Sequence, residues 1–172
     1  MEARSALFAS VLAVFALVGG PVSADDSGGG AGAGSASHGR TCEGRPTGVR
    51  LIVQVARLKS SQGEVAVTTV YPSDPRRFLA PHGKLMRVRA RADAPVTEAC
   101  FYLPKPDAYA VAVYHDANAN RDFDRNTVGL PVEGFAFSND APSKVGAPTF
   151  QAARFTVRPG DTVLRVKMRY VR

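Results

Sequence analysis

Residues 49–58 read VRLIVQVARL, and this stretch decides the class of the fold. Its strongly apolar side chains are Val49, Leu51, Val53 and Val55, and residues of mixed polarity stand between them. Successive side chains of a β-strand point to opposite faces of the sheet. An apolar side chain at every second position therefore predicts a strand with one face toward a hydrophobic core, rather than a helix with its longer period.

The same alternation returns in six further stretches of the chain. They are EVAVTTVY at 64–71, KLMRVRARA at 84–92, VTEACFYL at 96–103, AYAVAVYH at 108–115, RFTV at 154–157 and TVLRVKMRYV at 162–171. Short strands separated by turn residues are typical of all-β domains. About seven such strands predict a single β-sandwich, of immunoglobulin-like or transthyretin-like architecture.

Two connecting segments carry more specific expectations. SSQG at 60–63 supplies turn residues between the first two strands, so we expect those strands to form a hairpin. PTFQAARF at 148–155 is the only helix candidate, and its proline suits a first helical turn.

The start of the chain reads as an export signal. Arg4 supplies a positive charge, Ala6–Val18 is a nearly unbroken apolar run, and VSA at 22–24 resembles a cleavage site. The sequence therefore predicts a signal peptide at 1–24 and a periplasmic or secreted protein. The apolar run is shorter than the roughly 20 residues that cross a bilayer, so we expect no membrane span.

Residues 25–40 are rich in Gly, Ala and Ser and contain no large apolar side chain, which predicts a disordered linker. Residues 41–172 then form one domain of ordinary size. Two cysteines fall in this part, Cys42 and Cys100. An even count in an oxidising compartment predicts a disulfide, with two buried free thiols as the alternative.

The net charge is +7, and basic side chains alternate along two of the predicted strands. They are Arg87, Arg89 and Arg91 on one strand and Arg165, Lys167 and Arg169 on the other. Charged outer faces discourage sheets from pairing edge to edge. We expect weak association with anionic surfaces through these faces, and no specific nucleic-acid binding, because no aromatic platform accompanies them.

The run YHDANANRDFDRN at 114–126 places an oxygen-bearing side chain at every second position of its centre. Calcium takes six to eight oxygen ligands from carboxylates, amides, backbone carbonyls and water. One hypothesis for this loop is therefore a calcium site. Its candidate ligands are Asp116, Asn118, Asn120, Asp122, Asp124 and, from the segment that follows, Glu133.

The second hypothesis is a purely architectural turn. The opening of the run matches an EF-hand loop, but Arg121 stands where that loop has Gly and Thr127 where it has Glu. Strands on both sides also exclude an EF-hand. Asp and Asn are common in turns because their side chains bond to nearby backbone and they tolerate left-handed conformations. Arg121 and Arg125 would weaken the affinity for a cation.

No motif of a known enzyme class appears in the chain, such as a nucleophile elbow or a P-loop. His115 and Asp116 are neighbours on a strand and point to opposite faces, so we expect His115 to orient the loop rather than to form a dyad. A secreted hydrolase that uses carboxylates Asp116, Asp124 or Glu133 is the alternative function. The sequence favours a non-enzymatic binding or structural module.

Two stretches of the chain resemble a bacterial exported family known as domain of unknown function 2141. They are YAVAVYHDANANRDFDRNTVGLPVEGFAFSNDA at 109–141 and APTFQAARFTV at 147–157. The resemblance covers roughly Gly48 to Tyr170. The family motif falls here on Tyr109–Val111, His115, Asp116, Asn118, Asn120, Asp124, Gly129, Pro131, Glu133, Gly134, Phe137, Ser138 and Asn139.

The resemblance implies export in Gram-negative bacteria and a small β-sandwich, and it brings no established activity. Through the shared motif, we expect Ser138 and Asn139 to orient the loop together with His115. Two departures are visible. Ala136 stands where the family often has Gly, and Asp107 and Ala108 replace a turn that usually contains Gly.

Overall fold

The computed structural model describes residues 41–143 and 146–171. These residues belong to one compact unit, Ser37–Arg172. The signal peptide predicted at 1–24 and the linker predicted at 25–40 lie outside the described residues. In the part of the chain that the structure describes, no helix has the length and the apolar character needed to cross a membrane.

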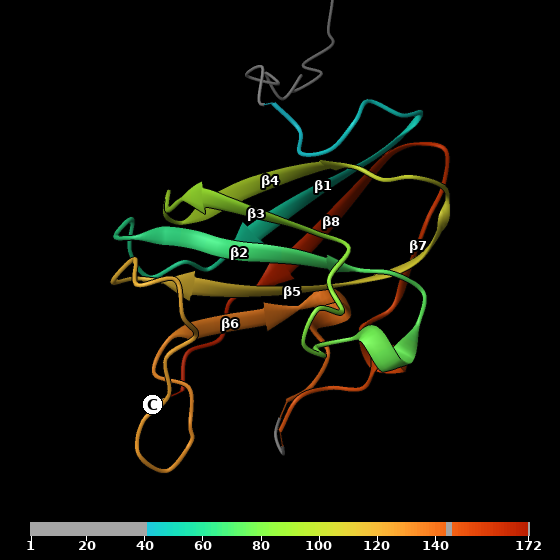
Figure 1. Ribbon diagram of the computed structural model, residues 1–172. Coiled ribbons are helices and arrows are strands. Elements are labelled where there is room, and N and C mark those ends of the chain that lie inside the picture. Colours follow the sequence, from blue (N-terminus) through green and yellow to red (C-terminus); the bar gives the residue numbers. More distant parts are fainter. Residues whose placement is uncertain (1–40, 144–145, 172) are drawn as a thin grey trace, which may run out of the picture. The chain divides into compact units, whose positions relative to one another are not determined.

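Within the described residues, eight strands form two sheets that enclose a hydrophobic core (Figure 1). The first sheet has the order β4-β1-β8, with β4 at Val96–Tyr102, β1 at Val49–Ala56 and β8 at Gly160–Lys167. The second has the order β3-β2-β5-β6, at Met86–Arg91, Glu64–Tyr71, Asp107–Asp116 and Gly134–Phe137, and β7 at Phe155–Val157 pairs with β5. The short helical segments are η1 at Pro75–Arg77, η2 at Ser138–Asp140 and α1 at Phe150–Ala153. The predicted all-β sandwich is confirmed.

Strand β1 lies at the centre of the first sheet, antiparallel to β4 and parallel to β8. Its apolar face is buried as the alternation predicts, and Leu51 and Val53 have no exposed surface. This face shares one hydrophobic cluster with Val111 and Val113 of β5, so the core lies between the two sheets. Burying a side chain of this size stabilises a fold by about 1.5–3 kcal/mol.

The predicted hairpin between β1 and β2 is wrong, because the two strands belong to different sheets. β4 and β8 occupy both edges of β1, and β2 lies between β3 and β5. The connection at 57–63 crosses from one sheet to the other, with left-handed backbone at Arg57 and Gly63. Alternation shows which face of a strand is buried, and it does not identify the neighbouring strand.

The predicted disulfide is present and joins Cys42 to Cys100 of β4. The next residue, Glu43, continues the attachment through its backbone. Its N–H donates to the carbonyl of Cys100, and its carbonyl accepts the N–H of Tyr102. The start of the domain is therefore tied to the first sheet by one covalent bond and two hydrogen bonds.

The outer face of the second sheet carries a hydrophobic cluster separate from the core. Its buried members are Tyr71, Ala110, Phe137, Ala141, Phe150 and Ala153. Phe78, from the connection after β2, packs its ring 5.2 Å from that of Tyr71 and 5.9 Å from that of Phe150. The helix predicted within 148–155 is present as α1, and the side chain of Thr149 caps it by accepting the N–H of Ala152. The chain thus covers part of this outer face with its own aromatic residues.

Candidate functional site

The loop that follows β5 is anchored by the last residue of that strand. Asp116 is completely buried, and its carboxylate oxygens accept the backbone N–H groups of Asn120 at 3.0 Å and Arg121 at 2.8 Å. A guanidinium nitrogen of Arg89 lies 3.5 Å from the same carboxylate. A buried charge is stable only when it is paired and hydrogen-bonded, and both conditions are met here.

Arg121 occupies the position where an EF-hand loop has glycine, and its φ of 71° is nevertheless left-handed. Such a conformation costs a residue with a Cβ about 1–2 kcal/mol. The bond from the Arg121 N–H to Asp116 offsets this cost, and the Arg121 carbonyl accepts hydrogen bonds from Tyr114 and Arg89. The sharp turn therefore forms without glycine.

Three exposed or half-buried side chains form the middle of the loop. The amide NH2 groups of Asn118 and Asn120 both donate to the carboxylate of Asp124, at 2.8 Å and 3.0 Å. The amide oxygens of the same residues accept backbone N–H groups two residues further on, from Asn120 and Asp122. Asp122 contributes its N–H to these contacts, and its own side chain is exposed. The middle of the loop is built from turns of the Asx type.

Glu133, the predicted closing ligand of a calcium site, holds backbone groups of the loop in this structure. The side chain is buried, and its two oxygens accept the N–H groups of Ala117 at 3.3 Å and Asp124 at 3.2 Å. Burial raises the pKa of Glu133, and the negative charges of Asp124 and Asp116 add to this rise, whereas the two N–H donors lower the pKa. The carboxylates of Asp124 and Asp116 are thus close enough to act on Glu133.

The fit to a metal ion is incomplete. Among the residues that the structure describes, no three His, Cys, Asp or Glu side chains are arranged to hold a metal ion. Asn118 and Asn120 present N–H groups, rather than oxygens, to Asp124. In a calcium site, both amides would instead have to turn their oxygens toward a cation held between them and the carboxylates.

His115 lies on the core side of β5 and is almost fully buried. Its Nε2 is 2.8 Å from the carbonyl of Gln62, so that nitrogen carries the proton. Its Nδ1 is 3.0 Å from the hydroxyl of Tyr170, which accepts the N–H of Lys59. The imidazole therefore joins β5 to the 59–62 connection and to the last residues of the chain.

Ser138 and Asn139 lie at the end of β6, and their described contacts reach α1 rather than the 116–124 loop. The hydroxyl of Ser138 accepts the N–H of Val111 at 2.9 Å and donates to the carbonyl of Ala153. The amide of Asn139 donates to the carbonyl of Arg154 at 2.6 Å. These two residues fix the helix that carries Phe150.

A feature that sequence reasoning missed lies on the outer face of the second sheet. Strand register places one row of side chains across four strands, in the order Arg87, Thr69, Ala112 and Phe137. The two central members are small, and larger rings stand on either side along the strands, at Tyr71, Tyr114 and Phe135. Opposed residues of neighbouring strands share a face, so small residues in mid-row leave space between large ones.

This space is a hollow of about 820 Å³, which we call the aromatic hollow. Its lining combines the rings of Tyr71, Tyr114, Phe123, Phe135 and Phe137 with Thr69 and Ala112. The Phe123 ring packs 5.4 Å from Tyr114 and 6.1 Å from Phe135, so it joins the loop after β5 to the sheet. The lining exposes far more apolar than polar surface.

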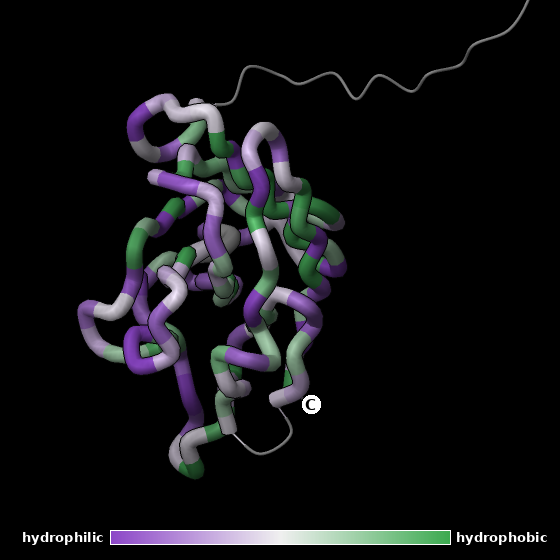
Figure 2. Tube along the Cα trace, turned by 90° about the vertical axis from the view of Figure 1, so that its right-hand side faces the viewer, coloured by the Kyte–Doolittle hydropathy of each residue, from purple (hydrophilic) through white to green (hydrophobic). Residues whose placement is uncertain are grey.

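One wall of the aromatic hollow is the arch at 125–131, which is held by its own hydrogen bonds. The side chain of Asn126 accepts the N–H groups of Val128 and Leu130, and its backbone N–H donates to the Leu130 carbonyl. Val128 is 75% exposed and Leu130 is 50% exposed. Figure 2 shows this projecting loop with a hydrophobic tip. The arch therefore exposes apolar side chains, and one of them, Leu130, lines the aromatic hollow.

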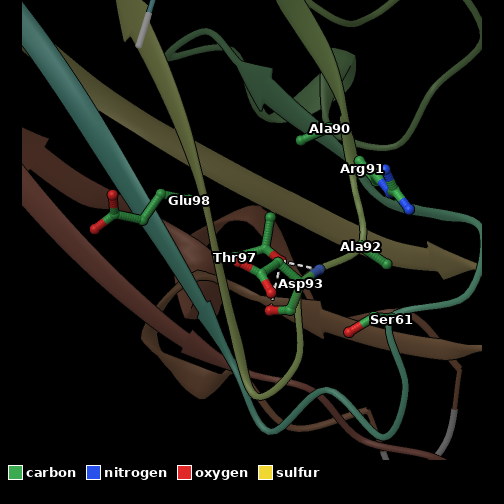
Figure 3. A pocket seen from close by; sticks show the side chains of 7 residues that line it. All are labelled: Ser61, Ala90, Arg91, Ala92, Asp93, Thr97 and Glu98. Carbon is green, nitrogen blue, oxygen red and sulfur yellow. Dashed lines mark hydrogen bonds between the residues drawn. The ribbon is translucent and has the colours of Figure 1, made fainter. Parts of the chain in front are cut away.

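A second hollow, of about 500 Å³, lies beside β3 and β4 (Figure 3). It is lined by two alanines and five polar or charged residues, and some of these polar groups form local hydrogen bonds. Thr97 exchanges two hydrogen bonds with the backbone of Asp93, and Ser61 accepts the N–H of Ala94. This second hollow offers a ligand no aromatic surface.

Comparison with known proteins places the chain in a family. A family model described as an uncharacterised protein conserved in bacteria matches residues 53–165. No curated protein and no solved structure matches the chain. The matched segment is well over half of the chain and contains both the 116–133 loop and the four strands of the aromatic hollow. The chain therefore belongs to the bacterial family known as DUF2141.

Proposed function

We propose that this protein is an exported, non-enzymatic binding module that takes a small apolar ligand in the aromatic hollow. The observation that carries the proposal is the hollow of about 820 Å³ among aromatic rings, whose lining includes the small residues Thr69 and Ala112 of one row. Pockets for small molecules have volumes of about 300–1,000 Å³ and mostly apolar or aromatic linings with a few polar groups. The hollow meets both descriptions.

The position of the carboxylates supports a binding role over the alternative hydrolase. Both oxygens of Asp116 and both oxygens of Glu133 hold backbone N–H groups of the loop. Of the hollows described above, neither is lined by Asp116, Asp124 or Glu133. A hydrolytic site needs carboxylates that converge on bound substrate beside a pocket, and these three brace a turn instead.

Binding of the neutral apolar dye Nile red tests this proposal. We expect the purified protein to enhance the fluorescence of the dye, and Ala112→Phe to abolish the enhancement because the new ring fills the floor of the aromatic hollow. Ala90→Leu, which fills the polar hollow of Figure 3, is the matched control and keeps the enhancement. Melting curves show whether each variant folds. Equal enhancement by the folded Ala112→Phe variant contradicts the proposal.

Calcium binding by the 116–133 loop is a second candidate function of the same region. It is supported by the negative charges of Asp124 and Asp116, which help to raise the pKa of Glu133, because a cation beside these carboxylates would offset their repulsion. A ligand at a hundred times its dissociation constant stabilises a fold by about 2.7 kcal/mol. We expect millimolar calcium to raise the melting temperature and Asp124→Asn to remove this effect. An unchanged melting temperature leaves the loop as an architectural turn.

A further inference from the structure

The charged residues of the aromatic hollow restrict the chemistry of its ligand. Among its described lining residues, Arg87 and Arg125 carry charge and none is acidic. Neither guanidinium forms an ion pair with a carboxylate of the described chain, whereas Arg89, two residues further along β3, pairs with Glu64 and Asp116. An apolar surface beside unpaired positive charge complements a molecule with an apolar body and a negative end.

Arg87 is oriented for this task by the sheet itself. Its Nε donates to the hydroxyl of Thr69 at 3.1 Å, across the register pair that joins β3 to β2. The two terminal nitrogens have no partner among the described residues. These nitrogens form the fork that binds a carboxylate through two parallel hydrogen bonds.

Arg125, which also lines the aromatic hollow, is engaged differently. Its guanidinium carbon lies 5.0 Å from the centre of the Phe123 ring, and one nitrogen donates to the carbonyl of Gly129 at 3.0 Å. These contacts hold the arch against Phe123. Arg125 therefore serves mainly as a wall of the hollow, and Arg87 is the better anchor for a charged group.

The strand spacing sets the length of the ligand. Neighbouring strands are about 4.8 Å apart, so the row from Arg87 on β3 to Phe137 on β6 is roughly 14 Å long. Its middle is the small pair Thr69 and Ala112, and its far end is aromatic. A chain of medium length that lies across the strands can reach from the guanidinium to the rings.

We infer that the ligand is a free amphipathic carboxylate, with its carboxylate on Arg87 and its apolar chain across Thr69 and Ala112 toward Phe135 and Phe137. This inference rests on the proposed function and adds the class of ligand and its orientation. The probes are decanoate and decanol, which share a chain length and differ in charge. A separate arm uses vesicles of anionic phosphatidylglycerol.

Calorimetry with the purified protein tests the inference. We expect decanoate to bind about tenfold more tightly than decanol, since a charge-assisted pair is stronger than a neutral hydrogen bond. Arg87→Gln is expected to remove this preference, so that decanoate and decanol then bind with equal affinity. Arg91→Gln, an exposed arginine of the same strand outside the aromatic hollow, is the matched control and keeps the preference.

Each contrary result identifies which claim has failed. Equal binding of decanoate and decanol keeps the aromatic hollow as a binding site and overturns the anionic class of ligand. A preference lost in Arg125→Gln instead of Arg87→Gln overturns the assignment of the anchor. Absence of binding by both probes overturns the proposed function as well, and binding to vesicles alone replaces the free carboxylate with a membrane surface.

Discussion

Replacement of Asp116 by alanine tests whether the loop after β5 is held by its own hydrogen bonds. The carboxylate is fully buried, and it binds two backbone N–H groups and faces Arg89. Hydrogen bonds to a charged group contribute about 1.5–3 kcal/mol each. Arg89 is partly exposed and keeps its contact with Glu64 in the variant. Loss of the ion pair between Arg89 and Asp116 therefore adds little to the loss of stability. Water that enters the opened turn recovers part of the total, and we expect a loss of about 3 kcal/mol.

The assay is urea unfolding followed by far-ultraviolet circular dichroism, with a chelator present to exclude metal ions. For a slope of about 2 kcal/mol per molar urea, the midpoint falls by about 1.5 M in Asp116→Ala. Asp122→Ala is the matched control, because its carboxylate is exposed in the same loop, and it changes stability by less than about 0.5 kcal/mol. Equal midpoints for the two variants would refute the reasoning, since the carboxylate of Asp116 would then contribute no more than an exposed turn residue.

Three further predictions concern other anchors of the fold. Replacement of Cys42 and Cys100 by serine lowers stability by about 2–4 kcal/mol, because the disulfide closes a long loop in the unfolded chain, and an unchanged unfolding midpoint contradicts this. The raised pKa of Glu133 means that the native state holds its proton more tightly than the unfolded state. The protein's free energy of unfolding, compared with that of Glu133→Gln, is therefore greatest below about pH 4 and falls as the pH rises through the native pKa. Urea unfolding of both proteins across that pH range measures this difference, and the opposite trend refutes the assignment. Ser138→Ala leaves the buried Val111 N–H without its acceptor and costs about 1–3 kcal/mol, measured by thermal unfolding, and a neutral effect would count against this bond as the link between β5 and α1.

Local pattern was sufficient for much of the fold. The alternation around Leu51 and Val53 predicted a strand with one buried face, and both side chains are fully buried. The cysteine count predicted the bond between Cys42 and Cys100. Each of these predictions depends on chemistry that acts within a strand or between two residues of one type, which a sequence displays directly.

Long-range pairing could not be predicted in the same way. The hairpin expected from SSQG at 60–63 fails because β4 and β8 take both edges of β1, and nothing within residues 49–71 records those partners. The aromatic hollow was missed for the same reason. Thr69 and Ala112 are unremarkable in the sequence, and only the register between β2 and β5 places them side by side among larger residues.

The 116–133 loop lies between these two cases. Its turn character was visible from the sequence, because Asp and Asn mark turns. The sequence suggested Glu133 as a closing metal ligand, and its role as an acceptor of two backbone N–H groups was not visible. The partners of the Asp and Asn side chains were not visible either. The sequence gives no sign that Arg89 of a distant strand faces Asp116, or that the amides of Asn118 and Asn120 turn toward Asp124.

The most direct test of the binding proposal is nuclear magnetic resonance of the isotope-labelled protein during titration with decanoate. We expect the amide signals of β2, β5 and β6 around Thr69, Ala112 and Phe135 to shift together, along with those of the 125–131 arch. Signals of β1 and β8 in the other sheet should stay in place. Shifts confined to the β4-β1-β8 sheet, or no shifts at saturating decanoate, would contradict the claim that the aromatic hollow is the ligand site.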